Sequence, residues 1–121
     1  ELIDVLRDIS IDLSYNINKK DGDLLRRRLQ NTSFIELIGK DPSILAWNYD
    51  KGREIGIKIY DTTGKMLSPD EIITSLFHEL AHSLTYIRGH AAPWKAKDDY
   101  LQSFKSKYVN ILNLKTSEFI K

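Results

Sequence analysis

The stretch that decides the fold covers residues 68–84 and reads SPDEIITSLFHELAHSL. It begins with Ser68 and Pro69, and Glu71 follows three places after the serine, which is the pattern of a capped helix start with proline in the first turn. Apolar residues then recur every three or four positions, which predicts an amphipathic helix with a broad face for the core. These residues are Ile72, Ile73, Leu76, Phe77, Leu80, Ala81 and Leu84.

Two histidines of this helix, His78 and His82, stand four residues apart, and Glu79 directly follows the first. Side chains at this spacing share one helical face about one turn apart, which is the separation that two imidazoles need to bind one tetrahedral zinc ion. Glu79 would then lie beside the metal and could take a proton from a zinc-bound water. The competing interpretation is a zinc-free helix in which both histidines are ordinary half-buried residues.

The remaining histidine, His90, directly follows Gly89, a residue suited to ending the helix and turning the chain. We therefore expect His90 to fold back as the third zinc ligand, with a fourth position open to water. Asp98 and Asp99 are the alternative ligands. Their simpler role is a solvated acidic patch near the start of the last helix, and either could also orient a zinc-bound imidazole.

Hydrolysis of a peptide bond also needs a group that stabilises the tetrahedral oxyanion. Tyr86 and Arg88 are the nearest candidates, because they follow the second histidine closely. Each also has a simpler role, since Tyr86 could pack in the core and Arg88 could interact with the helix dipole as a cation at the helix end.

Length and composition predict one domain over residues 1–121, because a chain of this length with 41% hydrophobic residues can build one core but not two. No stretch approaches the roughly 18 apolar residues of a membrane span, and no secretory segment begins the chain. We expect a monomeric intracellular protein without a membrane partner, nuclear if its source is eukaryotic. Since the chain has no cysteine, histidines and carboxylates are its strong metal ligands.

The other elements have weaker signals. Helices are expected over 1–15, 24–29 and 94–114, strands over 44–49 and 54–60, and either type over 34–38. The two strands flank a glycine-containing loop at 50–52 and form a hairpin, while Asp21-Gly22-Asp23 should interrupt the helical pattern near the N-terminus. The predicted class is α+β, with an antiparallel hairpin packed on the histidine-bearing helix and with flanking N- and C-terminal helices.

The middle of the chain resembles a known family. Residues 45–59 read LAWNYDKGREIGIKI, and together with a short turn and residues 67–82 they are similar to the WLM domain. That family is named for yeast and plant proteases that digest proteins crosslinked to DNA, and it is related to the SprT-like Spartan proteases. The resemblance extends over 44–101 and implies a small zincin-like domain. It also implies one Zn²⁺ ion, the ligands His78, His82 and His90, and the general base Glu79.

One feature departs from the family pattern, because WLM sequences usually place the third histidine closer to the second than His90 is to His82. The resemblance nevertheless implies a zinc metalloendopeptidase of DNA–protein crosslink repair. Its substrate would be a protein, and its activator would be DNA that is single-stranded or distorted.

DNA contacts would need cations, although a net charge of +1 is far from that of a strongly basic domain. The candidates are Arg26, Arg27 and Arg28 in the first part of the chain and Lys95 and Lys97 in the last helix. Solvated surface charge is the alternative explanation for both groups.

Two other functions stay open. One is a zinc peptidase with another substrate class, of the repressor-cleaving regulator type, which usually takes a downstream carboxylate as its third ligand. The other is a non-catalytic module that binds DNA or a protein, with zinc structural or absent. In a peptidase, one hairpin strand could pair with extended substrate backbone, provided that its edge is exposed.

Overall fold

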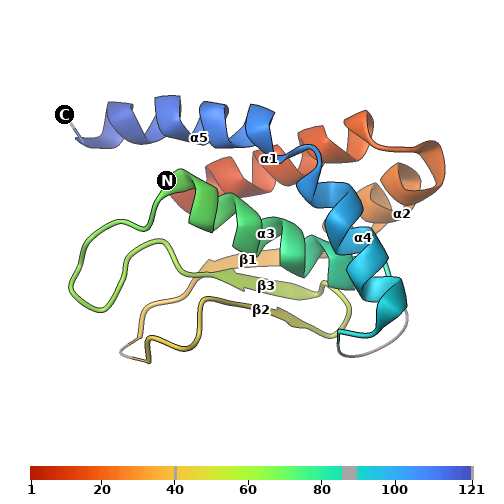
Figure 1. Cartoon of the computed structure of the whole chain (residues 1–121), viewed down its shortest axis with the longest axis horizontal. Coiled ribbons are helices and arrows are strands. Elements are labelled where there is room, and N and C mark those ends of the chain that lie inside the picture. Colours follow the sequence, from red (N-terminus) through yellow and green to blue (C-terminus); the bar gives the residue numbers. More distant parts are fainter. Residues whose placement is uncertain (40, 86–89, 121) are drawn as a thin grey trace.

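The computed structural model describes residues 1–39, 41–85 and 90–120 and places a helical layer on one face of a small sheet (Figure 1). The elements are α1 (Leu2–Asn16), α2 (Lys19–Leu29), β1 (Ser33–Glu36), β2 (Ala46–Tyr49), β3 (Glu54–Ile57), α3 (Pro69–Ser83), α4 (Ala92–Gln102) and α5 (Lys105–Ile120). Helix α3 lies between the sheet and α5, and α1 packs against β1 and α5. The predicted α+β class is confirmed.

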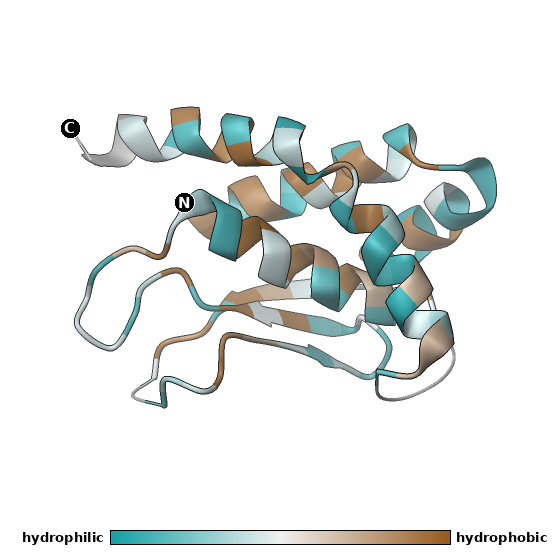
Figure 2. Ribbon diagram, in the orientation of Figure 1, coloured by the Kyte–Doolittle hydropathy of each residue, from teal (hydrophilic) through white to brown (hydrophobic). Residues whose placement is uncertain are grey.

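Helix α3 begins as its sequence predicts. The Ser68 hydroxyl accepts a hydrogen bond from the Glu71 backbone N–H at 3.2 Å, and the Glu71 carboxylate accepts one from the Ser68 backbone N–H at 3.4 Å. Hydrophobic segments alternate with polar ones along the ribbon of this helix (Figure 2), and its apolar residues Ile73, Leu76 and Leu80 are fully buried. Burying each such side chain stabilises the fold by roughly 1.5–3 kcal/mol. The helix ends at Ser83, before Gly89, which lies outside the described residues.

The sheet has the order β1-β3-β2. Strands β2 and β3 form the predicted antiparallel hairpin, with Tyr49 opposite Glu54. The segment over 34–38, for which the sequence left helix or strand open, contains most of strand β1. This strand pairs with β3 in parallel, with Phe34 opposite Ile55. Strand β3 is therefore central, and Ile55 and Ile57 are fully buried.

The predicted break at Asp21-Gly22-Asp23 is wrong, because α2 runs through it. The helix begins at Asn18, whose side-chain oxygen accepts a hydrogen bond from the Asp21 backbone N–H at 2.9 Å. Gly22 serves close packing, since a Cβ atom there would lie 2.3 Å from the Ser14 carbonyl oxygen of α1. The glycine lets two helices approach and does not end either of them.

The single last helix predicted over 94–114 is also wrong, because the structure has α4 and α5 in different directions (Figure 1). The chain turns at Ser103 and Phe104, where the Ser103 hydroxyl donates a hydrogen bond to the Tyr100 carbonyl at 2.5 Å. Buried Leu101 and Tyr108 stand on either side of this turn. The apolar spacing continues across it, so periodicity alone could not reveal the bend. Within the described ranges, no helix is long and apolar enough to cross a membrane.

Candidate metal centre

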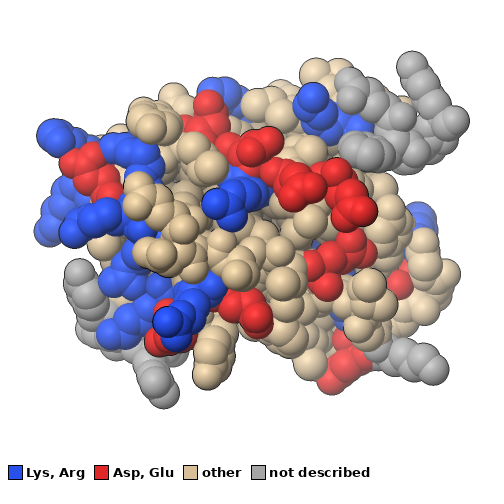
Figure 3. Space-filling view, turned by 180° about the vertical axis from the view of Figure 1, so that it is seen from behind, with Lys and Arg blue, Asp and Glu red and all other residues tan. Residues whose placement is uncertain are grey.

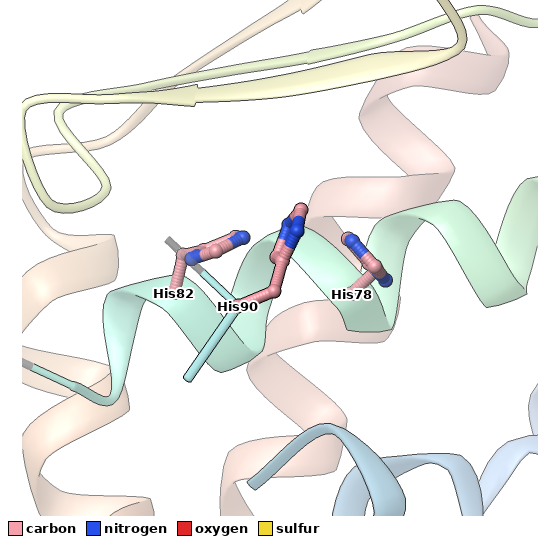
Figure 4. Close-up of side chains that lie close together, drawn as sticks. All are labelled: His78, His82 and His90. Atoms are coloured by element: carbon pink, nitrogen blue, oxygen red, sulfur yellow. The ribbon is translucent and has the colours of Figure 1, made fainter. Parts of the chain in front are cut away.

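Three histidines meet at one end of α3. His78 and His82 project from the helix, and His90 comes from the segment just before α4 (Figure 4). One ring nitrogen from each lies within 4.8 Å of the others. The ring centroid of His90 is 5.2 Å from that of His78 and 5.1 Å from that of His82. Residues predicted as a ligand set are thus side by side.

Trp94 of α4 supports this cluster from behind. Its ring centroid lies 4.4 Å from those of both His78 and His90, and its ring stacks on that of His82 at 5.1 Å. The indole N–H donates a hydrogen bond to the His78 carbonyl at 3.3 Å. Because only 7% of Trp94 is exposed, its ring restricts the positions of all three imidazoles.

Asp98 lies beside the cluster and is not one of the three converging groups. Its carboxylate is 3.7 Å from Nδ1 of His78, and its side chain is largely buried. This position matches the role of orienting an imidazole through its second nitrogen. Asp99 points elsewhere and is paired with Lys95 at 3.4 Å on the surface.

The two helical histidines favour the neutral form that binds metals. Burial, together with the positive charges of His90 and His78, lowers the pKa of His82 to about 4. Burial also lowers the pKa of His78, although the Asp98 carboxylate opposes that shift. Neutral imidazoles have a free nitrogen lone pair, so at neutral pH these side chains need not lose a proton to coordinate an ion.

Glu79 is a buried carboxyl group next to the cluster, with 7% of the residue exposed. Burial, together with the negative charge of Asp98, raises its pKa to about 7. A group with a pKa near the working pH can both accept and return a proton.

Asn48 of β2 is a site residue that the search for ligands and bases missed. Its side-chain NH₂ donates to the Glu79 carbonyl and to the Ser83 hydroxyl, both at 2.8 Å, while its side-chain oxygen accepts from the Gly52 N–H at 2.7 Å. Gly52 has a φ of +94°, and a Cβ there would lie 2.4 Å from the Ser83 hydroxyl oxygen. The hairpin is therefore held directly on α3. The signal in the sequence was the Asn-x-x-x-Gly spacing across the loop.

The predicted DNA-contacting cations have different environments. Arg26 donates to the Ser14 carbonyl at 2.7 Å, pairs with Asp23 and lies over the Tyr15 ring at 4.2 Å. Lys97 pairs with the buried Asp21 carboxylate at 2.8 Å. Both therefore connect elements of the fold.

The other cations are more accessible. Arg27 is exposed and Arg28 half-buried, and Lys95 is the exposed partner of Asp99. The two candidate oxyanion groups, Tyr86 and Arg88, lie outside the described residues.

Comparison with known proteins gives matches at the level of structure. No protein-family model and no curated protein matches the sequence. Two crystal structures of Wss1 from Saccharomyces cerevisiae, one of them of a mutant, match 71% of this chain with a TM-score of 0.54. The fold is similar to that of yeast Wss1.

The match covers 77% of the Wss1 chain at 21% identity and 79% of the mutant chain at 20% identity. At this level of identity the likeness to Wss1 concerns the fold. It agrees with the small α+β fold that the sequence predicted.

Proposed function

We propose that this chain is a zinc-dependent metalloendopeptidase that cleaves proteins crosslinked to or bound on DNA. The observation that carries the proposal is the convergence of His78, His82 and His90 within 4.8 Å, next to the buried Glu79 carboxyl group. The similarity of the fold to Wss1 and the sequence resemblance to WLM proteases support the peptidase class and the DNA-linked substrate.

The donor set fits a zinc ion. Three imidazole nitrogens, two of them on residues with a lowered pKa, are a combination that zinc hydrolases use when they keep one position open. His78, His82 and His90 would hold the ion. When bound, zinc would supply Lewis acidity to the peptide carbonyl and to the attacking water.

The protein's own groups would move the proton. Glu79 would accept a proton from the attacking water and then return it to the amine that leaves. Its raised pKa, about 7, suits both steps near neutral pH. Asp98 would orient His78, and Trp94 would keep bulk water from the inner side of the cluster.

An extended substrate has a place to bind next to these groups. Strand β2 is at the edge of the described sheet, and its other side pairs with β3. Asn48 ties this strand to the carbonyl of Glu79 at 2.8 Å. Backbone pairing along β2 would bring a peptide alongside the histidines, and Figure 4 shows the hairpin passing over their rings.

A cleavage assay with zinc tests the proposal. The chain itself and a DNA-binding protein are incubated without DNA, with single-stranded DNA and with duplex, and a Glu79→Gln variant serves as the control. We expect fragments only when DNA is present and none from Glu79→Gln. Cleavage that ignores DNA would contradict the substrate class, and a zinc-loaded chain that cleaves under no condition would contradict the peptidase.

A further inference from the structure

The described residues form an open hollow of about 600 Å³ between the C-terminal half of α2 and the turn that joins β2 to β3. We call it the basic hollow, because Arg27, Arg28, Lys51 and Arg53 line it together with one carboxylate, Asp50. Its volume lies within the range of about 300–1,000 Å³ that small-ligand sites have. A nucleotide unit therefore fits in it.

Charge is concentrated at this place. The basic hollow has a net charge of +3, whereas the whole chain has +1. Figure 3 shows Lys and Arg gathered at the end of the molecule where α2 and the β2–β3 turn lie, while Asp and Glu are more frequent toward the other end. Asp50 pairs with Arg53 at 3.3 Å, but both are exposed, and such a pair yields readily to a phosphate.

The two walls of the hollow are joined, because Nη1 of Arg28 donates to the Lys51 carbonyl at 2.9 Å. This contact fixes the turn against α2, while the side chains of Arg27 and Arg53 are exposed to a ligand. The site is therefore built from two elements that already touch, and a phosphate need not pull them together.

Aromatic side chains lead up to the same turn. Since Asn48 faces α3, its neighbours Trp47 and Tyr49 point to the opposite face of the sheet. Trp47 is 40% exposed and Tyr49 is 66% exposed, and Tyr49 directly precedes the turn. Tyr49 is not one of the lining residues of the hollow, but it directly precedes Asp50, which is. Unpaired bases stack on exposed aromatic rings that accompany a cationic groove.

We propose that the basic hollow binds the phosphate backbone of single-stranded DNA, with a base stacked on Tyr49. This inference rests on the proposed function, which makes DNA the polynucleotide. A single strand is the form proposed because stacking on an aromatic ring needs an unpaired base. Gly52 in its wall donates to Asn48, which bonds to the Glu79 carbonyl, so the bound strand lies next to the active-site helix.

Binding can be measured separately from cleavage in the Glu79→Gln background, by fluorescence anisotropy of a labelled oligodeoxythymidine. The test variant is Arg27→Ala/Arg53→Ala. The matched control is Lys65→Ala/Lys115→Ala, which removes one exposed cation from the loop between β3 and α3 and one from the C-terminal half of α5, two segments at the end of the molecule away from α2 (Figure 1). A duplex and an oligouridine of equal length are measured in parallel, and circular dichroism checks that every variant is folded.

We expect the test variant to weaken single-strand binding by at least about tenfold and to lower the slope of log K against log salt by about 1 to 2. The control pair should stay within about twofold of the parent, because long-range charge is screened at moderate salt. Tyr49→Ala should weaken binding without changing the slope, since stacking releases no counterions.

Equal losses in the test and control pairs, or none in the test pair, would overturn the hollow as the site. Tighter binding of duplex would overturn the single strand, and tighter binding of oligouridine would overturn DNA. These outcomes are distinct from failure of the proposed function. A wild-type chain that binds the oligonucleotide through the hollow but never cleaves refutes the peptidase alone, while DNA-dependent cleavage undiminished in Arg27→Ala/Arg53→Ala refutes the hollow alone.

Discussion

His90 is the residue that separates the proposed site from that of zinc peptidases with a downstream carboxylate ligand. Its ring lies beside those of His78 and His82, although it comes from a different segment. The spacing of the helical pair predicted two adjacent imidazoles, because a helix imposes that geometry. The place of His90 could not follow from spacing, since it depends on how the chain returns after α3.

His90→Ala should weaken zinc binding by more than about 100-fold, because it removes a direct ligand from a three-ligand site. The measurement is zinc affinity by competition with a chromophoric chelator. Asp99→Ala is the control, since Asp99 is exposed and its carboxylate pairs with Lys95 on the surface. Zinc retained by His90→Ala but lost by Asp98→Ala would show that a carboxylate is the third ligand.

Asp98→Asn should weaken zinc binding by about 10–100-fold, which is less than the loss of a ligand, because it leaves the three histidines in place and alters the carboxylate 3.7 Å from His78. The same chelator titration measures this effect. A loss as large as that in His90→Ala would contradict the orienting role, and an unchanged affinity would show that His78 needs no partner.

At the scale of elements, the sequence predicted α3 and the β2–β3 hairpin, because both have strong local signals in a capping box and a glycine-containing turn. Strand β1 was ambiguous, and its parallel pairing with β3 depends on a contact between distant segments. The prediction of a break at 21–23 and the prediction of one helix over 94–114 were wrong for a related reason. Gly22 lies inside α2 because it packs closely against α1, and the chain bends at Ser103 with a local hydrogen bond to Tyr100. The periodicity of apolar residues indicates neither contact.

Gly22→Ala tests the close approach of α1 and α2. The new Cβ would meet the Ser14 carbonyl at 2.3 Å, so the helices must separate, and we expect a loss of about 1–3 kcal/mol in the free energy of unfolding. Gly39→Ala is the matched control, because nothing lies within 4 Å of its added Cβ. Urea denaturation measures both, and equal stabilities would contradict the packing role of Gly22.

Asn48→Ala tests the attachment of the hairpin to α3. The change leaves the Glu79 carbonyl and the Gly52 N–H without their partner, and we expect a loss of about 1–3 kcal/mol in the free energy of unfolding. Ser83→Ala removes one of the three bonds to Asn48 and should cost less. Denaturant titration measures the free energy of unfolding of both variants. A larger loss in Ser83→Ala than in Asn48→Ala would contradict the central role of Asn48.

At the scale of the whole molecule, α3 contributes both the metal-binding histidines and the central part of the core. Its residues Ile73, Leu76, Phe77 and Leu80 are fully buried by contacts that involve no metal. The domain should therefore stay folded when a chelator removes zinc, unlike a zinc finger. We expect an unchanged far-ultraviolet circular dichroism spectrum, loss of cleavage, and a lower melting temperature than with zinc. Unfolding on chelation would contradict this expectation.

Long-range polar contacts that join α1 to α5 make stability depend on pH. The Tyr108 hydroxyl donates to the Asp12 carboxylate at 2.7 Å, and this bond, with help from Lys107, holds the pKa of Asp12 below its ordinary value. The Asp12 carboxyl group therefore binds a proton less tightly in the folded chain than in the unfolded chain. The stabilisation is present above the ordinary pKa of about 3.9 and is lost as pH falls through the folded value.

Asp12→Asn should be less stable than the wild type at pH 7, and the difference should be smaller at pH 3, because the unfolded chain then takes up a proton at Asp12 that the folded form binds less tightly. Denaturant titrations at both pH values measure it. Asp8→Asn, an equal change at an exposed position of the same helix, should show no such trend. A difference that stays constant with pH would contradict the role of the Asp12 charge.

The turn between β2 and β3 has little freedom to change its length. Asn48 reaches back to the Gly52 N–H, and Gly52 packs so closely on Ser83 that a side chain would not fit. A loop with one residue more or fewer would have to give up the bond or the contact. Loop length at this place is therefore a simple way to recognise, among distant sequences of this fold, those chains whose hairpin is fastened to the histidine-bearing helix in the same manner.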